Sequence, residues 1–201
     1  MATPIDFWFS IGSLYTYLTV MRLPEVEART GVSVRWRPFS VRTIMVEMDN
    51  VPARKPLKLA YSWRDVERRA QDYGFAFAAR PPYPLKNSDL ANRIATAGAA
   101  EGWCADYVRA AYRRWFIEHE EAGSEPSNTR CLQEIGQDAA RVVARAQSDE
   151  TGKSYEAATD EARRLGIFGV PTFATRGEIF WGDDRLEDAI RWQGSAAHKR
   201  D

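Results

Sequence analysis

The stretch DFWFSIGSLYTYL, residues 6–18, reads as a strand, a tight turn and the start of a helix. The aromatic run at residues 7–9 is typical of a strand, and Gly12 permits backbone angles that other residues avoid. Ser13 then stands at the N-cap position of a helix, because an apolar stripe with approximately helical spacing begins directly after it. The sequence therefore predicts a polar side chain at the N-terminus of the first helix.

The N-terminus of a helix favours an anion, because it carries unpaired N–H groups and a partial positive charge. In proteins built on this strand-turn-helix unit, that position often holds a cysteine whose pKa the helix lowers. Here it holds Ser13, and no cysteine lies nearby in the sequence. A serine hydroxyl does not ionise there, but it can donate a hydrogen bond to the thiolate of another molecule. Two interpretations stay open, and these residues alone favour the simpler one, an N-cap serine without further function.

Composition predicts a globular protein without a charged macromolecular partner. Of the 201 residues 44% are hydrophobic, and 28 basic residues balance 28 acidic ones. Because the basic residues are also dispersed, we expect neither nucleic acid nor an anionic membrane as a partner. No apolar run has the length that a membrane span needs, and the N-terminal residues lack a signal-peptide pattern. We therefore expect a cytoplasmic protein.

The cysteines and histidines predict no metal site and no catalytic base. Cys104 and Cys131 fit neither a CxxC nor a zinc-binding spacing, so we interpret them as ordinary thiols in a reducing compartment. His119 lies in the charged run EHEE, and His198 lies in the polar run SAAHKRD. Both patterns are typical of solvated surface. Any chemistry must then proceed without histidine, metal or a protein thiolate.

The order of the predicted elements indicates an α/β fold. Residues 32–39 alternate as a second strand, which forms a parallel strand-helix-strand unit with the first, and residues 40–55 look like a loop. Near the C-terminus, residues 168–181 read as two short strands around a turn at Arg176 and Gly177, and residues 185–192 read as a helix. We predict one sheet domain, residues 1–45 plus 166–201, interrupted by a helical domain, residues 46–165. The helices predicted within that middle part span residues 57–73, 90–100, 105–119, 129–135, 139–146 and 154–165.

Three segments carry a resemblance that covers essentially the whole chain: DFWFSIGSLYTYL at the front, and FGVPTF followed by WGDDRL at the back. With these segments the chain resembles the thioredoxin fold of the DsbA type, with a large inserted all-helical domain. Within that fold it resembles the family of 2-hydroxychromene-2-carboxylate isomerases and kappa-class glutathione transferases. The sequence departs from the family pattern at Ser10, where an aspartate is usual, and at Leu14, where a proline is usual. Since proline is dispensable in a first helical turn, we expect Leu14 to keep the helix.

The resemblance implies that glutathione is the cofactor and that Ser13 binds its sulfur as the catalytic residue. It also implies that Val170 and Pro171 form a cis-proline turn, where the Val170 backbone pairs with the cysteinyl backbone of glutathione. The resemblance implies that Asp183, Asp184 and Arg185 bind the γ-glutamyl end of glutathione. The remaining cofactor-binding positions that it implies are Asn50 and Lys58.

The resemblance implies that the protein is a glutathione-dependent isomerase in aromatic catabolism. It also implies that the protein forms a homodimer. Its substrate would be a small aromatic α-keto acid or its cyclic hemiketal. We expect an aromatic substrate pocket and a basic group for the substrate carboxylate. The candidates are Trp8, Tyr83, Trp115 and Phe168 for the pocket, and Arg80 or Lys86 for the carboxylate.

Two other functions stay open. A glutathione transferase would need the same Ser13, so sequence does not separate it from an isomerase. A non-catalytic protein that holds peptides at the edge formed by Val170 and Pro171 would instead show no affinity for glutathione. A disulfide oxidoreductase is disfavoured, because the turn before the first helix lacks cysteines.

Overall fold

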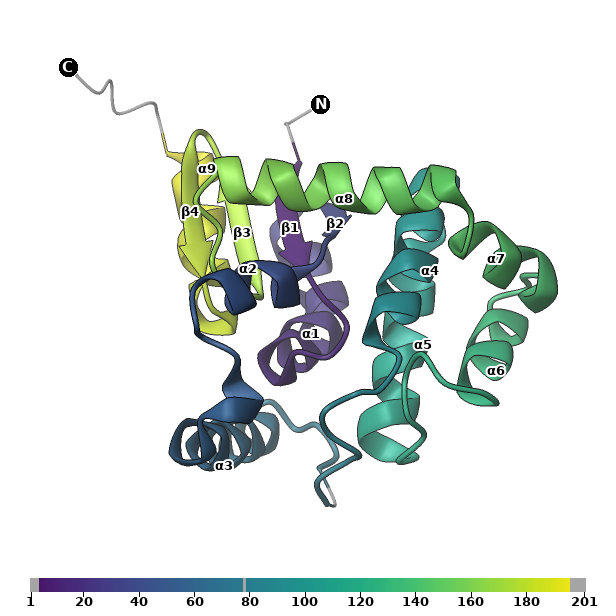
Figure 1. The fold of residues 1–201 in the computed structure, drawn as a ribbon. Helices are drawn as coiled ribbons and strands as arrows, with labels where there is room; N and C mark the ends of the chain where they lie inside the picture. Colours follow the sequence, from purple (N-terminus) through teal and green to yellow (C-terminus); the bar gives the residue numbers. More distant parts are fainter. Residues whose placement is uncertain (1–3, 78, 196–201) are drawn as a thin grey trace.

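The computed structural model describes residues 4–77 and 79–195, and its centre is a four-stranded sheet with the order β2-β1-β3-β4 (Figure 1). β1 (Ile5–Phe9) and β2 (Val34–Pro38) are parallel and are linked by α1 (Leu14–Thr30). β3 (Thr172–Thr175) runs antiparallel to β1 and forms a hairpin with β4 (Glu178–Trp181). The predicted strand-helix-strand unit and the C-terminal hairpin are confirmed.

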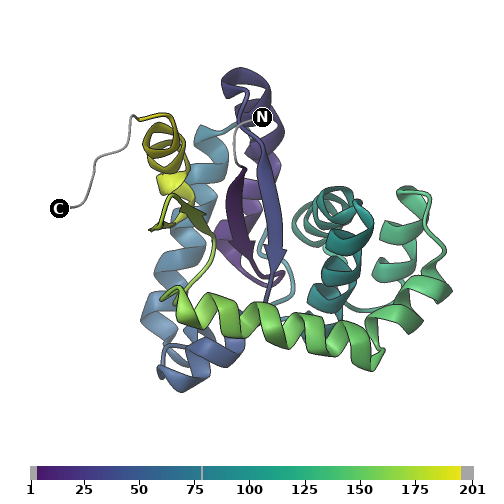
Figure 2. The ribbon, with the colours of Figure 1, turned by 90° about the horizontal axis from the view of Figure 1, so that it is seen from above.

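Helices cover both faces of this sheet (Figures 1 and 2). α1 and α9 (Leu186–Gly194) lie on one face, whereas α2 (Val41–Glu47) and α8 (Asp149–Arg164) lie on the other. The side chains of β1 alternate between the two faces, so Phe7 and Phe9 join the large core and Trp8 joins a smaller core under α2 and α8. An aromatic run that is buried on both sides explains why the first strand shows no polar alternation.

The middle of the chain is helical, as predicted. It contains η1 (Pro52–Arg54), α3 (Pro56–Asp72), α4 (Ser88–Glu101), α5 (Cys104–Ile117), α6 (Ser127–Glu134) and α7 (Ala139–Ala146). α3 packs on α1, and α4 packs against the edge strand β2. One continuous core joins these helices to the sheet. The division into two domains stays a prediction, and α8, which falls in the predicted insertion, contacts both parts.

The interpretation of residues 40–55 as a loop is wrong, because α2 and η1 lie there. Ser40 caps α2 by accepting a hydrogen bond from the Thr43 N–H, and Val41 and Ile44 are buried in the smaller core. A helix of 7 residues is too short to show a helical period in sequence, and its stability comes from packing. α8 also begins five residues earlier than predicted, because Ser148 caps it.

In the part of the chain that the structure describes, no helix is both long and apolar enough to cross a membrane. The same residues contain no group of three or more histidine, cysteine, aspartate or glutamate side chains that could hold a metal ion.

Candidate active site at the start of α1

The register of the sheet brings the turn after β1 next to the loop before β3. Trp8 pairs with Thr172 across the two antiparallel strands, so the residues that follow β1 lie beside those that precede β3. The Ser13 hydroxyl donates a hydrogen bond to the Val170 carbonyl over 3.3 Å, although the two residues are 157 positions apart. The Val170–Pro171 peptide bond is cis, as the resemblance implied. The structure thus joins the front and back segments at one place.

Ser13 is the N-cap of α1. Its Oγ accepts a hydrogen bond from the Thr16 N–H at 3.3 Å, and Leu14 begins the helix in place of a proline, as expected. The first turn of α1 contains no acidic side chain. Gly12 has a φ of 119°, which only glycine adopts readily, so the turn depends on it. The partial positive charge at the start of α1 is therefore not neutralised by the chain itself.

Two side chains from the inserted helices hold this turn in place. Asn92 on α4 accepts a hydrogen bond from the Ile11 N–H at 2.7 Å, and its Nδ2 donates to the Ile11 carbonyl at 3.0 Å. The Tyr112 hydroxyl on α5 lies 3.2 Å from the Ser10 carbonyl and 3.0 Å from the Ser13 carbonyl. Burial raises the pKa of Tyr112 well above its usual range, so this hydroxyl stays a donor. Sequence reasoning missed both residues, and the only signal was a polar side chain within each apolar helix face.

We expect Asn92→Leu to destabilise the protein by about 1–3 kcal/mol, because it leaves the buried N–H and C=O of Ile11 without partners. It should also weaken ligand binding at Ser13, since the turn is no longer held. Urea unfolding and ligand titration measure the two effects. The control is Asn128→Leu, which removes an equally buried asparagine on α6, far from the turn in sequence. Equal loss of ligand binding in both variants would contradict a specific role for Asn92.

The turn opens into a cleft between α2, η1, α3, the start of α4 and the loops at residues 83–85 and 168–170. Phe168 and Trp181 form one wall, with ring centroids 4.7 Å apart and an interplanar angle of 65°. Tyr83 also lines the cleft, and its ring lies edge-on to that of Trp63 with the ring centroids 5.5 Å apart. Gly169 allows Trp181 to lie across the loop, since a Cβ there would come within 2.5 Å of the indole nitrogen. The cleft is thus mainly apolar and partly aromatic.

Four of the predicted glutathione-binding residues line this cleft: Ser13, Asn50, Lys58 and Val170. The Lys58 ammonium donates a hydrogen bond to Asn50 Oδ1 at 2.9 Å, so these two side chains act together. Pro171 follows Val170 directly, and its carbonyl accepts a hydrogen bond from the Gly182 N–H at 2.9 Å. This bond ties the segment at residues 183–185 to the cis-proline loop, although that segment does not itself line the cleft.

The pocket candidates divide into two groups. Tyr83 and Phe168 line the cleft, but Trp8 and Trp115 do not, because both are fully buried in the cores. The Arg37 guanidinium lies over the Trp8 ring, 4.5 Å from the ring centroid. The Trp115 indole N–H donates a hydrogen bond to the Pro82 carbonyl. Two of the four aromatic side chains that were expected in the pocket therefore lie in the cores instead.

Neither basic candidate for the substrate carboxylate lines the cleft. Arg80 and Lys86 are exposed outside it, and the arginine that lines it is Arg42 on α2. The sequence interpretation missed Arg42 because it missed α2.

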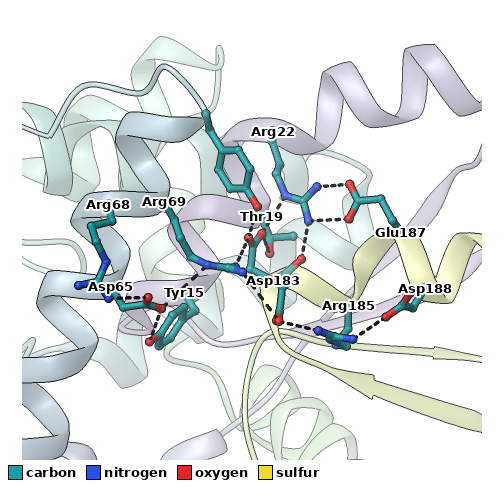
Figure 3. A network of polar contacts seen from close by, with 12 residues as sticks. Tyr15, Thr19, Arg22, Asp65, Arg68, Arg69, Asp183, Arg185, Glu187 and Asp188 are labelled. Atoms are coloured by element: carbon teal, nitrogen blue, oxygen red, sulfur yellow. Dashed lines mark hydrogen bonds and ion pairs between the residues drawn. The ribbon is translucent and has the colours of Figure 1, made fainter.

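Asp183 is buried in a network of polar side chains from α1, α3 and η2 (Asp183–Arg185) (Figure 3). Its Oδ1 accepts hydrogen bonds from Thr19 Oγ1 and Arg22 Nε, each at 2.9 Å. Its Oδ2 accepts from Arg69 Nη1 at 3.2 Å and from the Tyr73 hydroxyl at 3.0 Å. Four donors occupy the lone pairs of this carboxylate, so it binds the three elements together.

Asp184 and Arg185 extend this network to the surface, because the Asp184 carboxylate lies 3.8 Å from Arg69 Nη2 and both side chains are about half-exposed. Arg185 Nη2 donates to Asp184 Oδ2 at 2.9 Å, and its Nη1 donates to Asp188 at 2.8 Å. Partial burial acts to raise the pKa of Asp184, but the hydrogen bond from Arg185 and the charge of Arg69 outweigh it and lower that pKa. Asp184 is therefore a half-exposed carboxylate beside the cis-proline loop.

The two cysteines are buried and free. Burial raises the pKa of Cys131 to about 11 and that of Cys104 further, so neither forms a thiolate near neutral pH. His119 is exposed, and His198 lies outside the described residues. These findings agree with a site that depends on Ser13.

A family model for the DSBA-like thioredoxin domain matches residues 4–190. The chain belongs to this family. Two curated relatives, both named 2-hydroxychromene-2-carboxylate isomerase, align over nearly their full length. The relative from Sphingobium xenophagum is 29% identical over 195 residues, 93% of this chain and 96% of its own. The relative from Pseudomonas putida is 28% identical over 185 residues, 90% of each chain. The relatives are isomerases, in agreement with the enzyme class expected from the sequence.

Solved structures place this DSBA-like chain in the same fold. A 2-hydroxychromene-2-carboxylate isomerase structure superposes with a TM-score of 0.84 at 26% identity and covers 96% of this chain and 95% of its own. The cytosolic disulfide reductase DsbM of Pseudomonas aeruginosa superposes with a TM-score of 0.68 at 16% identity, over 95% of each chain, which shows the fold alone. The predicted thioredoxin-like fold with its helical insertion is confirmed.

Proposed function

We propose that this chain is a glutathione-dependent isomerase of the 2-hydroxychromene-2-carboxylate type, with trans-o-hydroxybenzylidenepyruvate as its product. The proposal rests above all on Ser13, a hydroxyl at a helix N-terminus that opens into an apolar cleft with no thiolate of its own. The names of the relatives support the substrate class.

The residues at the site fit glutathione. The hydrogen bond from Ser13 to the Val170 carbonyl is long, at 3.3 Å, so its replacement by a charge-assisted bond to a thiolate costs little. To make most of a thiol with a pKa of about 8.5 ionised at pH 7, the site must lower that pKa by about two units, or about 2.7 kcal/mol. A hydroxyl donor together with the start of α1 is sufficient for this.

The ends of the tripeptide match other groups of the site. Lys58 and Asn50 would bind one carboxylate, and the Val170 backbone would pair with the cysteinyl residue. Since the carboxylate of Asp183 has no free lone pair, we assign the γ-glutamyl ammonium to Asp184, with Arg185 beside it. Asp183 would then contribute to glutathione binding through its backbone, and its side chain would fix the position of η2.

The chemistry that bound glutathione would supply is a reversible addition of its thiolate to the double bond of the ring-opened cis α-keto acid. That keto acid forms when the ring C–O bond of the hemiketal breaks and the proton of its hydroxyl group passes to the phenol oxygen. The addition would permit rotation, and elimination of the thiolate would restore the double bond. Ser13 would hold the sulfur as a thiolate, and Phe168 and Trp181 would pack on the aromatic ring. The apolar walls would exclude water from the reacting carbon atoms.

The test is a calorimetric titration of glutathione into the wild-type protein, followed by assay with 2-hydroxychromene-2-carboxylate. We expect saturable binding, an ultraviolet thiolate band and isomerisation in which glutathione is recovered unchanged. A glutathione transferase would use the same Ser13 but consume glutathione in proportion to product. The absence of binding would contradict both and favour a non-catalytic protein of the same fold.

On the family resemblance we also propose that the protein is cytoplasmic and forms a homodimer. Cell fractionation would test the location, and light scattering would test the oligomeric state.

A further inference from the structure

The cleft carries two positive charges and, among its described lining residues, no acidic side chain. The two charged lining residues are Arg42 and Lys58. Lys58 is bound to Asn50, but Arg42 forms no hydrogen bond or ion pair with any residue that the structure describes. The neighbouring Arg37, in contrast, pairs with Glu161. A guanidinium without a partner beside an apolar cleft is suited to an anionic ligand.

Arg42 lines the same cleft as Ser13. Arg42 and Met45 are three positions apart on α2 and line the same wall. Tyr83 lines the cleft as well, and its phenol responds to the Arg42 charge: burial raises the pKa of Tyr83, and the guanidinium opposes that rise. Arg42 and the aromatic side chain of Tyr83 therefore face a common space.

We propose that Arg42 binds the carboxylate of the aromatic substrate, and this inference rests on the proposed function. The two expected ligands, glutathione and an aromatic α-keto acid, both bring carboxylates into one cleft. Lys58 with Asn50 forms one cationic position, and Arg42 forms a second that is still without a partner. The planar guanidinium matches a carboxylate through two parallel hydrogen bonds, which a lysine does not offer.

The experiment compares Arg42→Ala and Arg42→Lys with the wild type on 2-hydroxychromene-2-carboxylate and on its methyl ester. For the acid we expect Arg42→Ala to raise KM about 10- to 100-fold while kcat changes little, because a charge-assisted hydrogen bond is lost. For the ester we expect no comparable difference between the variants. Arg42→Lys should reverse part of the increase in KM, because lysine restores the positive charge but not the two parallel hydrogen bonds. The Kd for glutathione should stay within about twofold, since that ligand uses Lys58.

The matched control is Arg80→Ala, which removes an exposed arginine that does not line the cleft and should leave both substrates unaffected. Equal losses for acid and ester, or a Kd for glutathione that rises in step with KM, would overturn the assignment of Arg42 while leaving the isomerase intact. If the wild-type protein neither binds glutathione nor isomerises the acid, the proposed function fails and this inference fails with it.

Discussion

Replacing Ser13 with alanine is expected to remove the thiolate band of bound glutathione and to lower kcat/KM by about 100- to 1000-fold, the usual cost of losing one hydrogen-bond donor to a reacting anion. The physical reason is that Ser13 is the side-chain hydroxyl placed at the start of α1, where the helix favours a negative charge. Ultraviolet difference spectra and initial rates at saturating glutathione measure the two effects.

Ser148→Ala is the matched control for this variant. Ser148 caps α8 with the same geometry, accepting from the Thr151 N–H at 3.3 Å, and it lies outside the cleft. Each alanine variant should lose about 1 kcal/mol of stability through its cap. Only Ser13→Ala should lose the thiolate band. A wild-type band in Ser13→Ala would show that the serine is a cap and nothing more, which is the simpler interpretation of the sequence.

Replacing Asp183 with alanine is expected to lower the free energy of unfolding by about 3–5 kcal/mol, because it removes the fully buried carboxylate partner of Arg22 and leaves that guanidinium only Glu187, whose side chain is 39% exposed. The side chain of Asp183 is 0% exposed and that of Arg22 is 8% exposed, so water does not compensate the loss. Chemical denaturation measures the change. Glutathione binding should weaken in addition, since η2 lies beside the cis-proline loop.

Asp188→Ala is the control for this second prediction. Asp188 pairs with Arg185 and Arg191 at the surface, where ion pairs contribute at most about 1 kcal/mol. Combining Asp183→Ala with Arg22→Met should cost less than the sum of the two changes, by about 1–3 kcal/mol, because the pair shares one interaction. A loss from Asp183→Ala no larger than that from Asp188→Ala would show that the buried network is not a stabilising centre.

The Ser13 cap and the location of most helices were predictable because their signals are local. A cap depends on residues within one turn, and long amphipathic helices such as α5 repeat their pattern several times. The cis form of the Val170–Pro171 bond followed only from the family resemblance, since an X-Pro bond is trans by default. α2 was missed because 7 residues carry no periodic signal.

Two of the pocket assignments are wrong because burial depends on contacts between distant segments. Trp8 and Trp115 were expected in the pocket, but they lie in the cores. The role of Asp183 at the γ-glutamyl end stays a prediction, but four donors from α1 and the end of α3 occupy its carboxylate. Arg42 was absent from the candidates, although it lines the cleft.

The amino-acid sequence alone predicted the order of the strands and of the longer helices, the polar group at the start of α1 and the lack of a reactive protein thiol, because each depends on a few neighbouring residues. Only the tertiary structure decided that Asn92 and Tyr112, 81 to 102 positions from the residues they contact, hold the turn of Ser13. The reason is physical: a hydrogen bond between distant segments leaves no pattern along the chain, and packing of the whole core selects which polar groups meet.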